Sequence, residues 1–220
     1  MPSNATTARA SLLRTRFLQM CVRAESMVRL SVRSVVERDV SLGRAVVEND
    51  VELDQLELEV DRLCLEILAH DAPTGRALRV TTACMKMVVD LERIGDLSVN
   101  VAERGLELAR RSGIEAPTDI TRMGTLAGDM VRMAADAFVL RDIELAREVL
   151  LRDDEIDSLN RETFKRLISA MADHPDQADR ALCLTNISKH LERVGDHAVN
   201  IAEMVVFVID GEDIRHDRGE

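Results

Sequence analysis

Apolar residues recur at helical spacing along nearly the whole chain, and the interruptions of this pattern are short and polar. The chain has four prolines, at positions 2, 73, 117 and 175, and the last three lie inside these interruptions. The segments "HDAPTG" and "DHPDQ" are typical of turns between helices, and "RRSGIEAPTD" is typical of a linker. The pattern therefore predicts an all-α protein.

Two further breaks, "RDVSLGRA" and "RDIELARE", contain no proline. In each of them an aspartate, Asp39 or Asp142, can act as an N-cap, because its side-chain oxygen can accept from the free N–H groups of a new helix. Taken together, the breaks predict six helices, at about 8–38, 40–70, 75–111, 118–141, 143–172 and 176–210.

The breaks occur in the same order twice, which indicates an internal repeat. At an offset of 103 residues, Met27, Val28 and Arg29 align with Met130, Val131 and Arg132, and the offset falls to 100 in the third helix of each half. Short turns between long helices favour antiparallel packing. We therefore predict two tandem antiparallel three-helix bundles, at 8–112 and 117–210, with residues 1–7 and 211–220 as disordered tails.

Composition and charge narrow the class of function. The chain has 220 residues, of which 46% are hydrophobic and 2% aromatic, so aliphatic side chains must build the core. A net charge of −11 argues against binding to nucleic acid or anionic lipid. The four cysteines show no metal-ligand spacing and are expected to be small core residues. No apolar run is long enough to span a bilayer, and no secretory signal is evident, so we expect a cytoplasmic protein without membrane insertion.

One acidic sequence motif occurs twice, as "LERIGDLSVNVAE" at 91–103 and as "LERVGDHAVNIAE" at 191–203, with nine identical positions out of thirteen. On a helix its Glu and Asp side chains share one face, and the second helix of the first half carries a similar stripe of four carboxylates. The candidate site residues are Asp50, Asp54, Glu57, Asp61, Glu92, Asp96, Asn100 and Glu103 in the first half, and Asp153, Asp157, Glu192, Asp196, Asn200 and Glu203 in the second.

Three interpretations of these stripes are open. They can be solvated faces that form salt bridges with other helices, although Arg93 and Arg193 are expected to point away from the stripes. They can hold a general acid/base pair, but such a pair does not need several carboxylates on each helix. They can also bind hard cations through oxygen ligands, with iron, Mn²⁺, Mg²⁺ or Ca²⁺ more natural than Zn²⁺, since no Cys or His lies on a stripe.

The same residues carry a resemblance to a known family. The motifs Glu92-x-x-x-Asp96 and Glu192-x-x-x-Asp196, with "ND---LD--E" at 49–57 and "DDEID" at 153–157, resemble those of the PhoU family of phosphate-signalling regulators. The resemblance covers roughly residues 10–210. It is specific because two copies of the motif occur in register within a six-helix repeat.

The resemblance implies a PhoU-like fold with a multinuclear metal cluster on each carboxylate face, most naturally of iron. It also implies a cytosolic adapter, often dimeric and without enzymatic turnover, that acts with a Pst-type phosphate ABC transporter and a two-component sensor kinase. The implied role is negative regulation of phosphate uptake and of phosphate-starvation signalling.

The chain departs from the family pattern at three positions. Ala77 stands where an acidic residue is common at the start of the third helix, and Asn160 and Phe164 interrupt the second-half stripe. These departures are expected to lower metal occupancy. We therefore expect two unequal metal sites, with the better one in the first half.

Two other classes of function are also considered. A carboxylate-bridged di-iron enzyme on a helical bundle would be expected to carry Glu-x-x-His motifs, and none precedes any of the five histidines. A metal-free helical interaction protein would instead present its acidic faces to a basic partner. Iron-dependent oxygen consumption by the purified protein would support the enzyme, and metal-free stripes that bind an arginine-rich surface would support the interaction protein.

Overall fold

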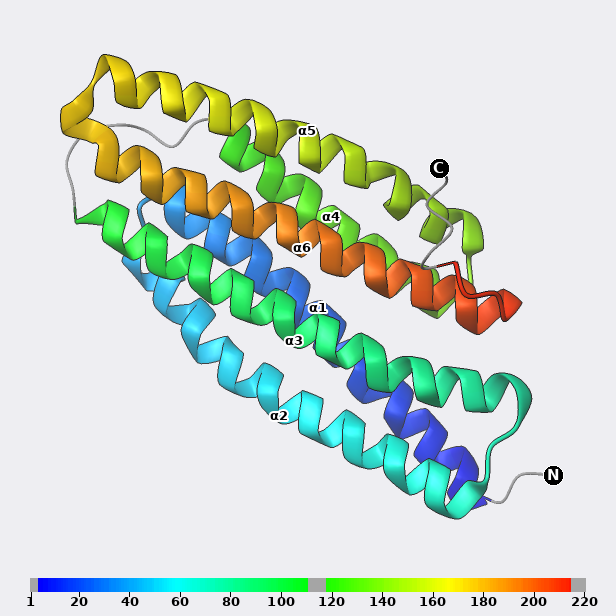
Figure 1. The fold of residues 1–220 in the computed structure, drawn as a ribbon. Helices are drawn as coiled ribbons and strands as arrows, with labels where there is room; N and C mark the ends of the chain where they lie inside the picture. The colour runs from blue at the N-terminus through cyan, green and yellow to red at the C-terminus, as the bar shows by residue number, and fades with distance from the viewer. Residues whose placement is uncertain (1–3, 111–117, 215–220) are drawn as a thin grey trace.

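The computed structural model describes residues 4–110 and 118–214, and six long helices make up most of this part of the chain. The helices are α1 (Asn4–Val36), α2 (Val40–Asp71), α3 (Gly75–Ala109), α4 (Thr118–Leu140), α5 (Ile143–Asp173) and α6 (Ala178–Asp210), with a short 3₁₀ turn at Pro175–Gln177. Each helix runs roughly antiparallel to the one before it, along the length of the molecule (Figure 1). The predicted all-α fold of six helices is confirmed.

The helix starts follow the predicted capping. Asp39 accepts hydrogen bonds from the backbone N–H groups of Ser41 and Leu42, at 2.7 and 3.3 Å, and Asp142 accepts one from Leu145 at 3.1 Å. The residue before each aspartate, Arg38 or Arg141, has a positive φ. This left-handed conformation ends one helix and allows the cap to start the next.

The first helix begins earlier than predicted. Residues 4–7, which we expected to be part of a disordered tail, form the first turn of α1. Arg9 and Thr6 both donate hydrogen bonds to the carboxylate of Asp71 at the end of α2, with Arg9 Nε at 2.9 Å and Thr6 Oγ1 at 2.9 Å. These contacts tie the start of α1 to the end of α2. Residues 1–3 and 215–220 lie outside the described part.

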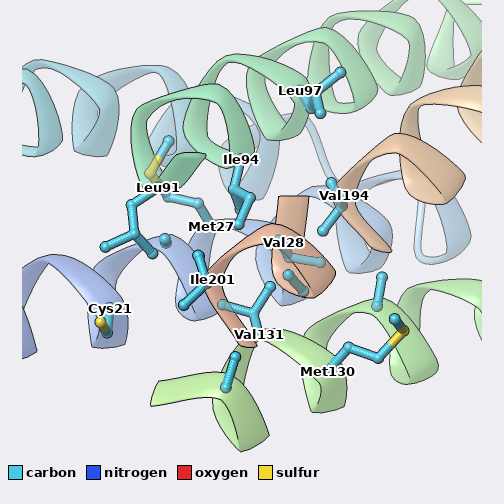
Figure 2. Close-up of a cluster of buried hydrophobic side chains, with 14 of the residues drawn as sticks. Cys21, Met27, Val28, Leu91, Ile94, Leu97, Met130, Val131, Val194 and Ile201 are labelled. Carbon is cyan, nitrogen blue, oxygen red and sulfur yellow. The ribbon is translucent and has the colours of Figure 1, made fainter. Parts of the chain in front are cut away.

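The two repeats share one hydrophobic core. Figure 1 shows α1, α2 and α3 on one side and α4, α5 and α6 on the other, with α3 beside α6 along the middle. Side chains from α1, α3, α4 and α6 meet in this middle layer (Figure 2), including Met27, Ile94, Met130 and Val194, all of which are buried. The repeats are therefore held to each other by the burial of apolar surface.

The cysteines and the helix composition agree with the sequence-based expectations. Cys21, Cys64, Cys84 and Cys183 are all buried and none forms a disulfide. No helix of the described residues combines the length and the apolar character needed to cross a bilayer.

Candidate metal centre

Gly95 sets the distance between the two helices that carry the first-half carboxylates. A Cβ at this position would overlap with Cδ2 of the fully buried Leu53 and would stand 3.2 Å from Oδ1 of Asp50. The missing side chain therefore lets α2 pack directly on α3 and brings the Asp50 carboxylate against the glycine. Gly195 is its counterpart in the second half, but there a Cβ would meet Ile156 at 3.0 Å and no carboxylate.

The first-half carboxylates on α2 and α3 influence one another's pKa values. Burial raises the pKa of Asp50, and the negative charges of Asp54 and Asp96 raise it further. Burial also raises the pKa of Glu57, with contributions from Asp61, Asp54 and Asp96. Six predicted site residues on the two helices therefore belong to one group of electrostatically coupled acids: Asp50, Asp54, Glu57, Asp61, Glu92 and Asp96.

Glu92 connects the stripe on α3 to the stripe on α2. Burial raises the pKa of its carboxyl group, as do Asp96 on the same helix and Glu57 on the facing helix, while Arg93 lowers it. In a group of acids that raise one another's pKa values, negative charge exceeds the positive charge nearby. Such a region favours the binding of a cation.

Arg93 contradicts one sequence-based prediction. We expected it to point away from the stripe, but its Nη1 lies 3.1 Å from Asp96 Oδ2 and its Nε lies 3.4 Å from Glu92 Oε2. A helical projection places the Cβ and ignores the length of the arginine side chain, which reaches back to its neighbours. Arg93 is about half exposed, so these ion pairs are screened by solvent and are weak.

Asn100 and Glu103 continue the α3 helix beyond this cluster. The side-chain amide of Asn100 donates a hydrogen bond to the backbone oxygen of Asp96 at 2.9 Å, within its own helix. Glu103 is exposed and lies about 10 Å further along the helix than Asp96. The structure thus places these two predicted ligands at the edge of the candidate site.

The second half keeps the α6 stripe but has fewer acids facing it. Burial raises the pKa of Glu192, and the charges of Asp196 and Asp157 raise it further, while Lys189 and Arg193 lower it. The buried Oε2 of Glu192 accepts no hydrogen bond, and Nζ of Lys189 is 4.0 Å away. Asp153 and Asp157 lie on the facing α5 helix.

Asn160 and Phe164 take the places that correspond to Glu57 and Asp61. Asn160 Oδ1 accepts a hydrogen bond of 2.6 Å from Ser188 Oγ, so its carbonyl is already engaged. The ring of Phe164 is about half exposed. Asp157 also has a cation close by, since Nη1 of Arg161 is 3.4 Å from its Oδ2. The second site therefore offers less uncompensated negative charge than the first.

Asn200 does not lie in the predicted second site. Its Nδ2 donates a hydrogen bond of 3.0 Å to Oδ1 of Asp90 on α3, and Nδ1 of His197 lies 2.9 Å from the same oxygen. These contacts link α3 to α6 across the two repeats. The sequence contained one signal for them, since His197 stands where the first copy of the motif has the buried Leu97. Glu203, predicted for the same site, is buried on α6.

Ala77 is also distant from the carboxylates. It lies in the first turn of α3, fifteen residues before Glu92, which corresponds to about 22 Å along the helix. The departure at this position therefore removes no ligand from this cluster, and its effect on metal occupancy stays a prediction.

The donor chemistry of the first half fits a hard cation, because all of its donors are carboxylate oxygens. Within the described residues, no three His, Cys, Asp or Glu side chains already surround a common point at ligand distance. The side chains of Glu92 and Asp96 would have to turn from Arg93 to act as ligands. All six acids lie on two rigid helices, so these changes involve rotamers only.

Comparison with known proteins places the chain in a family. The family model described as the PhoU domain matches residues 17–105 and again residues 120–205. The phosphate-specific transport system accessory protein PhoU homologues of Pseudomonas putida and Pseudomonas aeruginosa are each 34% identical over 207 residues, which is 93% of this chain and 80% and 85% of theirs.

Solved structures agree with this assignment. The crystal structure of PhoU from Pseudomonas aeruginosa superposes with a TM-score of 0.90 at 32% identity, covering 94% of this chain and 99% of that one. The phosphate transport system regulatory protein PhoU from Streptococcus pneumoniae shares the fold, with a TM-score of 0.85. With two matched domains, two sets of carboxylate motifs and this fold, the chain belongs to the PhoU family.

Proposed function

We propose that this protein is an accessory protein of a phosphate-specific transport system. The observation that carries the proposal is the match of both repeats to the PhoU domain, together with relatives that are themselves named as accessory proteins of such systems. In this role the protein acts by contact with partners and not by turnover of a substrate. Its place of action is the cytoplasm.

The finer role is negative regulation. We propose that the protein binds a Pst-type ABC transporter and a two-component sensor kinase when phosphate is plentiful, and that it restrains both uptake and starvation signalling. A homodimer would present two copies of each docking face. The long, straight helices support a role as an adapter, because they provide extended and rigid surfaces (Figure 1).

A bound hard cation forms part of this proposal. Asp50, Asp54 and Glu57 of α2, with Glu92 and Asp96 of α3, would hold it. The cation would supply positive charge to carboxylates that otherwise raise one another's pKa values. In its presence, these residues would hold α2 firmly against α3. Iron is the first metal to assay, followed by Mn²⁺, Mg²⁺, Ca²⁺ and Zn²⁺.

The regulatory role can be tested in cells that lack their own copy of this gene. Tagged protein is purified after growth in high and in low phosphate, and the captured transporter and kinase components are quantified. We expect more capture in high phosphate, and we expect deletion to leave phosphate uptake and starvation reporters switched on. Capture that does not depend on phosphate supply would contradict the proposal.

A matched pair of variants connects this assay to the metal site. Asp54→Asn removes a carboxylate from the cluster, and Glu48→Gln removes one from an exposed position on the same helix. We expect the first variant to reduce the response to phosphate and the second to leave it unchanged. If both behave like the unmodified protein, the cluster has no part in regulation.

A further inference from the structure

A cavity of about 580 Å³ lies at the end of the molecule where α1 and α3 begin and where α2, α4 and α6 end. It is separate from the carboxylate cluster, which lies nearer the middle of α2 and α3. Its volume falls within the range of pockets that enclose small-molecule ligands. Both repeats contribute to its wall.

The interior of the cavity is apolar. The ring of Phe138 forms part of the wall and is held in place by a tilted contact with Phe17, at 4.8 Å between the ring centroids. Aliphatic and thiol side chains from four other helices complete this surface. They are Leu13, Ile67, Val80, Cys84 and Val208.

Arginines surround the opening. Arg14 of α1, Arg76 of α3 and Arg141 after α4 all line the cavity and are exposed. Within the described residues, none of the three forms an ion pair with a carboxylate. Many other described arginines do lie within 4.0 Å of an acid, among them Arg16, Arg29, Arg122 and Arg166.

The one carboxylate at this opening does not neutralise them. Asp71 lines the cavity, but it accepts hydrogen bonds from Arg9 and Thr6, and Arg9 holds its pKa below the usual range. Its charge is thus already paired with an arginine outside the cavity. Among the described residues that line the cavity, the charged side chains without an ion pair are those of the three arginines.

The start of α3 lies at the cavity. Arg76 lies in the first turn, where a cation is unfavourable because the helix dipole is positive there. Thr74, at the N-cap, makes no side-chain hydrogen bond to the free N–H groups of the helix. An arginine in this place does not stabilise the helix, which favours a role in binding.

The second repeat does not have the same cavity wall. At the positions equivalent to Val80 and Cys84 it has Arg180 and Leu184, which are larger and are buried, with Arg180 only 6% exposed. The apolar wall with an arginine opening is therefore specific to one end of the molecule. It does not follow from the repeat.

From these observations we propose that the cavity binds a small amphipathic anion, with an alkyl or other apolar body inside and a phosphate or carboxylate head at Arg14, Arg76 and Arg141. Such a ligand would contact α1, α2 and α3 of the first repeat and α4 and α6 of the second. Its binding would stabilise the packing of the two repeats against each other.

The test uses isothermal titration calorimetry on the full chain, stripped of metal with chelator so that the carboxylate cluster does not contribute. Decyl phosphate, used below its micelle-forming concentration, is the probe, and hexyl phosphate, decanol and inorganic phosphate are the comparisons. We expect decyl phosphate to bind most tightly. Each methylene removed should weaken binding by up to about fourfold.

Variants locate the binding. Arg76→Gln should weaken the binding of decyl phosphate by about two- to fivefold, as for a solvent-screened ion pair. It should leave the binding of decanol unchanged. Arg44→Gln is the matched control, because Arg44 is an exposed arginine on α2 outside the cavity. Ala77→Leu places a larger side chain at the exposed edge of the cavity and should reduce the advantage of decyl over hexyl phosphate.

Several results would overturn the proposal. They are equal binding of decanol and decyl phosphate, binding of inorganic phosphate as tight as that of the alkyl phosphate, or an equal effect of the Arg76 and Arg44 variants. Tighter binding of an acidic peptide than of decyl phosphate would also overturn it, since the site would then be a protein-docking site. Thermal melts of each variant separate loss of binding from loss of folding.

Discussion

The two repeats have the same helices and nearly the same motif on the third helix, but they differ in the helix that faces this motif. In the first repeat, α2 presents Asp50, Asp54, Glu57 and Asp61 to α3. In the second, α5 presents Asp153 and Asp157, while the positions equivalent to Glu57 and Asp61 hold an amide and an aromatic ring. The motif on the third helix is thus kept in both repeats, while the acids on the helix that faces it are not.

The largest expected difference between the repeats is in metal binding. We expect protein purified without chelator to carry a hard cation, and we expect the double variant Asp54→Asn/Glu57→Gln to lose at least about tenfold in affinity, since affinity follows the number of charged ligands. Asp157→Asn in the second repeat should have a smaller effect. Elemental analysis and cation titration measure both.

Glu48→Gln is the control for this comparison, because it removes one exposed charge from α2 without touching the cluster. A preparation with no metal above the background of the buffer would contradict the cluster. Equal losses from the two repeats would contradict the inequality between them.

The next difference concerns the glycines that bring the helices together. Gly95→Ala should lower the free energy of unfolding by about 1–3 kcal/mol, because the added Cβ overlaps with the buried Leu53 side chain. Gly195→Ala meets Ile156 at 3.0 Å, so its cost should largely be offset by the gain in helix propensity of about 1 kcal/mol.

Urea denaturation of the two variants measures this difference. Gly128→Ala is a suitable control, since a Cβ there would make ordinary contacts of 3.4 Å or more with Arg29, and we expect it to be neutral or stabilising. If Gly95→Ala were as stable as Gly195→Ala, then the close approach of α2 to α3 would not depend on the glycine.

Much of the fold could be predicted from the sequence, because helical periodicity, prolines and two capping aspartates act locally. The start of α1 could not be predicted in this way. Residues 4–7 are small and polar, and they are fixed by the bonds from Thr6 and Arg9 to Asp71, which is more than sixty residues away in the chain. A tertiary contact of this kind leaves no local signal.

The candidate site, too, could be predicted from the sequence only in part. The projection on a helix correctly placed the carboxylates of α2 and α3 on facing stripes, because their short side chains follow the Cβ direction. It failed for Arg93, whose long side chain folds back on the stripe, and for Asn200, whose amide is drawn to Asp90 on the other repeat. Long side chains and contacts between repeats depend on the assembled structure.

A smaller effect is expected in the pH dependence of stability. The folded-state pKa values of Asp50, Glu57 and Glu92 are raised, so the folded protein binds more protons than the unfolded chain as these groups titrate. The free energy of unfolding of metal-free protein should therefore gain from these groups as the pH falls from neutral toward their raised pKa values. Asp71, with its lowered pKa, acts in the opposite direction at more acidic pH.

Urea midpoints of chelator-treated protein between about pH 7 and pH 5 measure this dependence. Glu57→Gln/Glu92→Gln should reduce the gain, and Glu192→Gln should reduce it less, because it replaces one carboxyl group of raised pKa where the double variant replaces two. A saturating cation should remove the gain at neutral pH. If the gain in stability is unchanged in Glu57→Gln/Glu92→Gln, then other groups cause it.

The smallest effect is expected where the two repeats can be made more alike. Phe164→Asp restores to α5 the acid that α2 has at Asp61, and it should cost little stability, because the ring is about half exposed. In a background of Asp54→Asn/Glu57→Gln, which removes the first site, this change should raise the remaining cation affinity severalfold.

Phe164→Ser controls for loss of the ring without the added charge. A gain with Asp and none with Ser would show that charge on the facing helix limits the second site. No gain with either would move the limit to Asn160, whose carbonyl oxygen already accepts a hydrogen bond of 2.6 Å from Ser188.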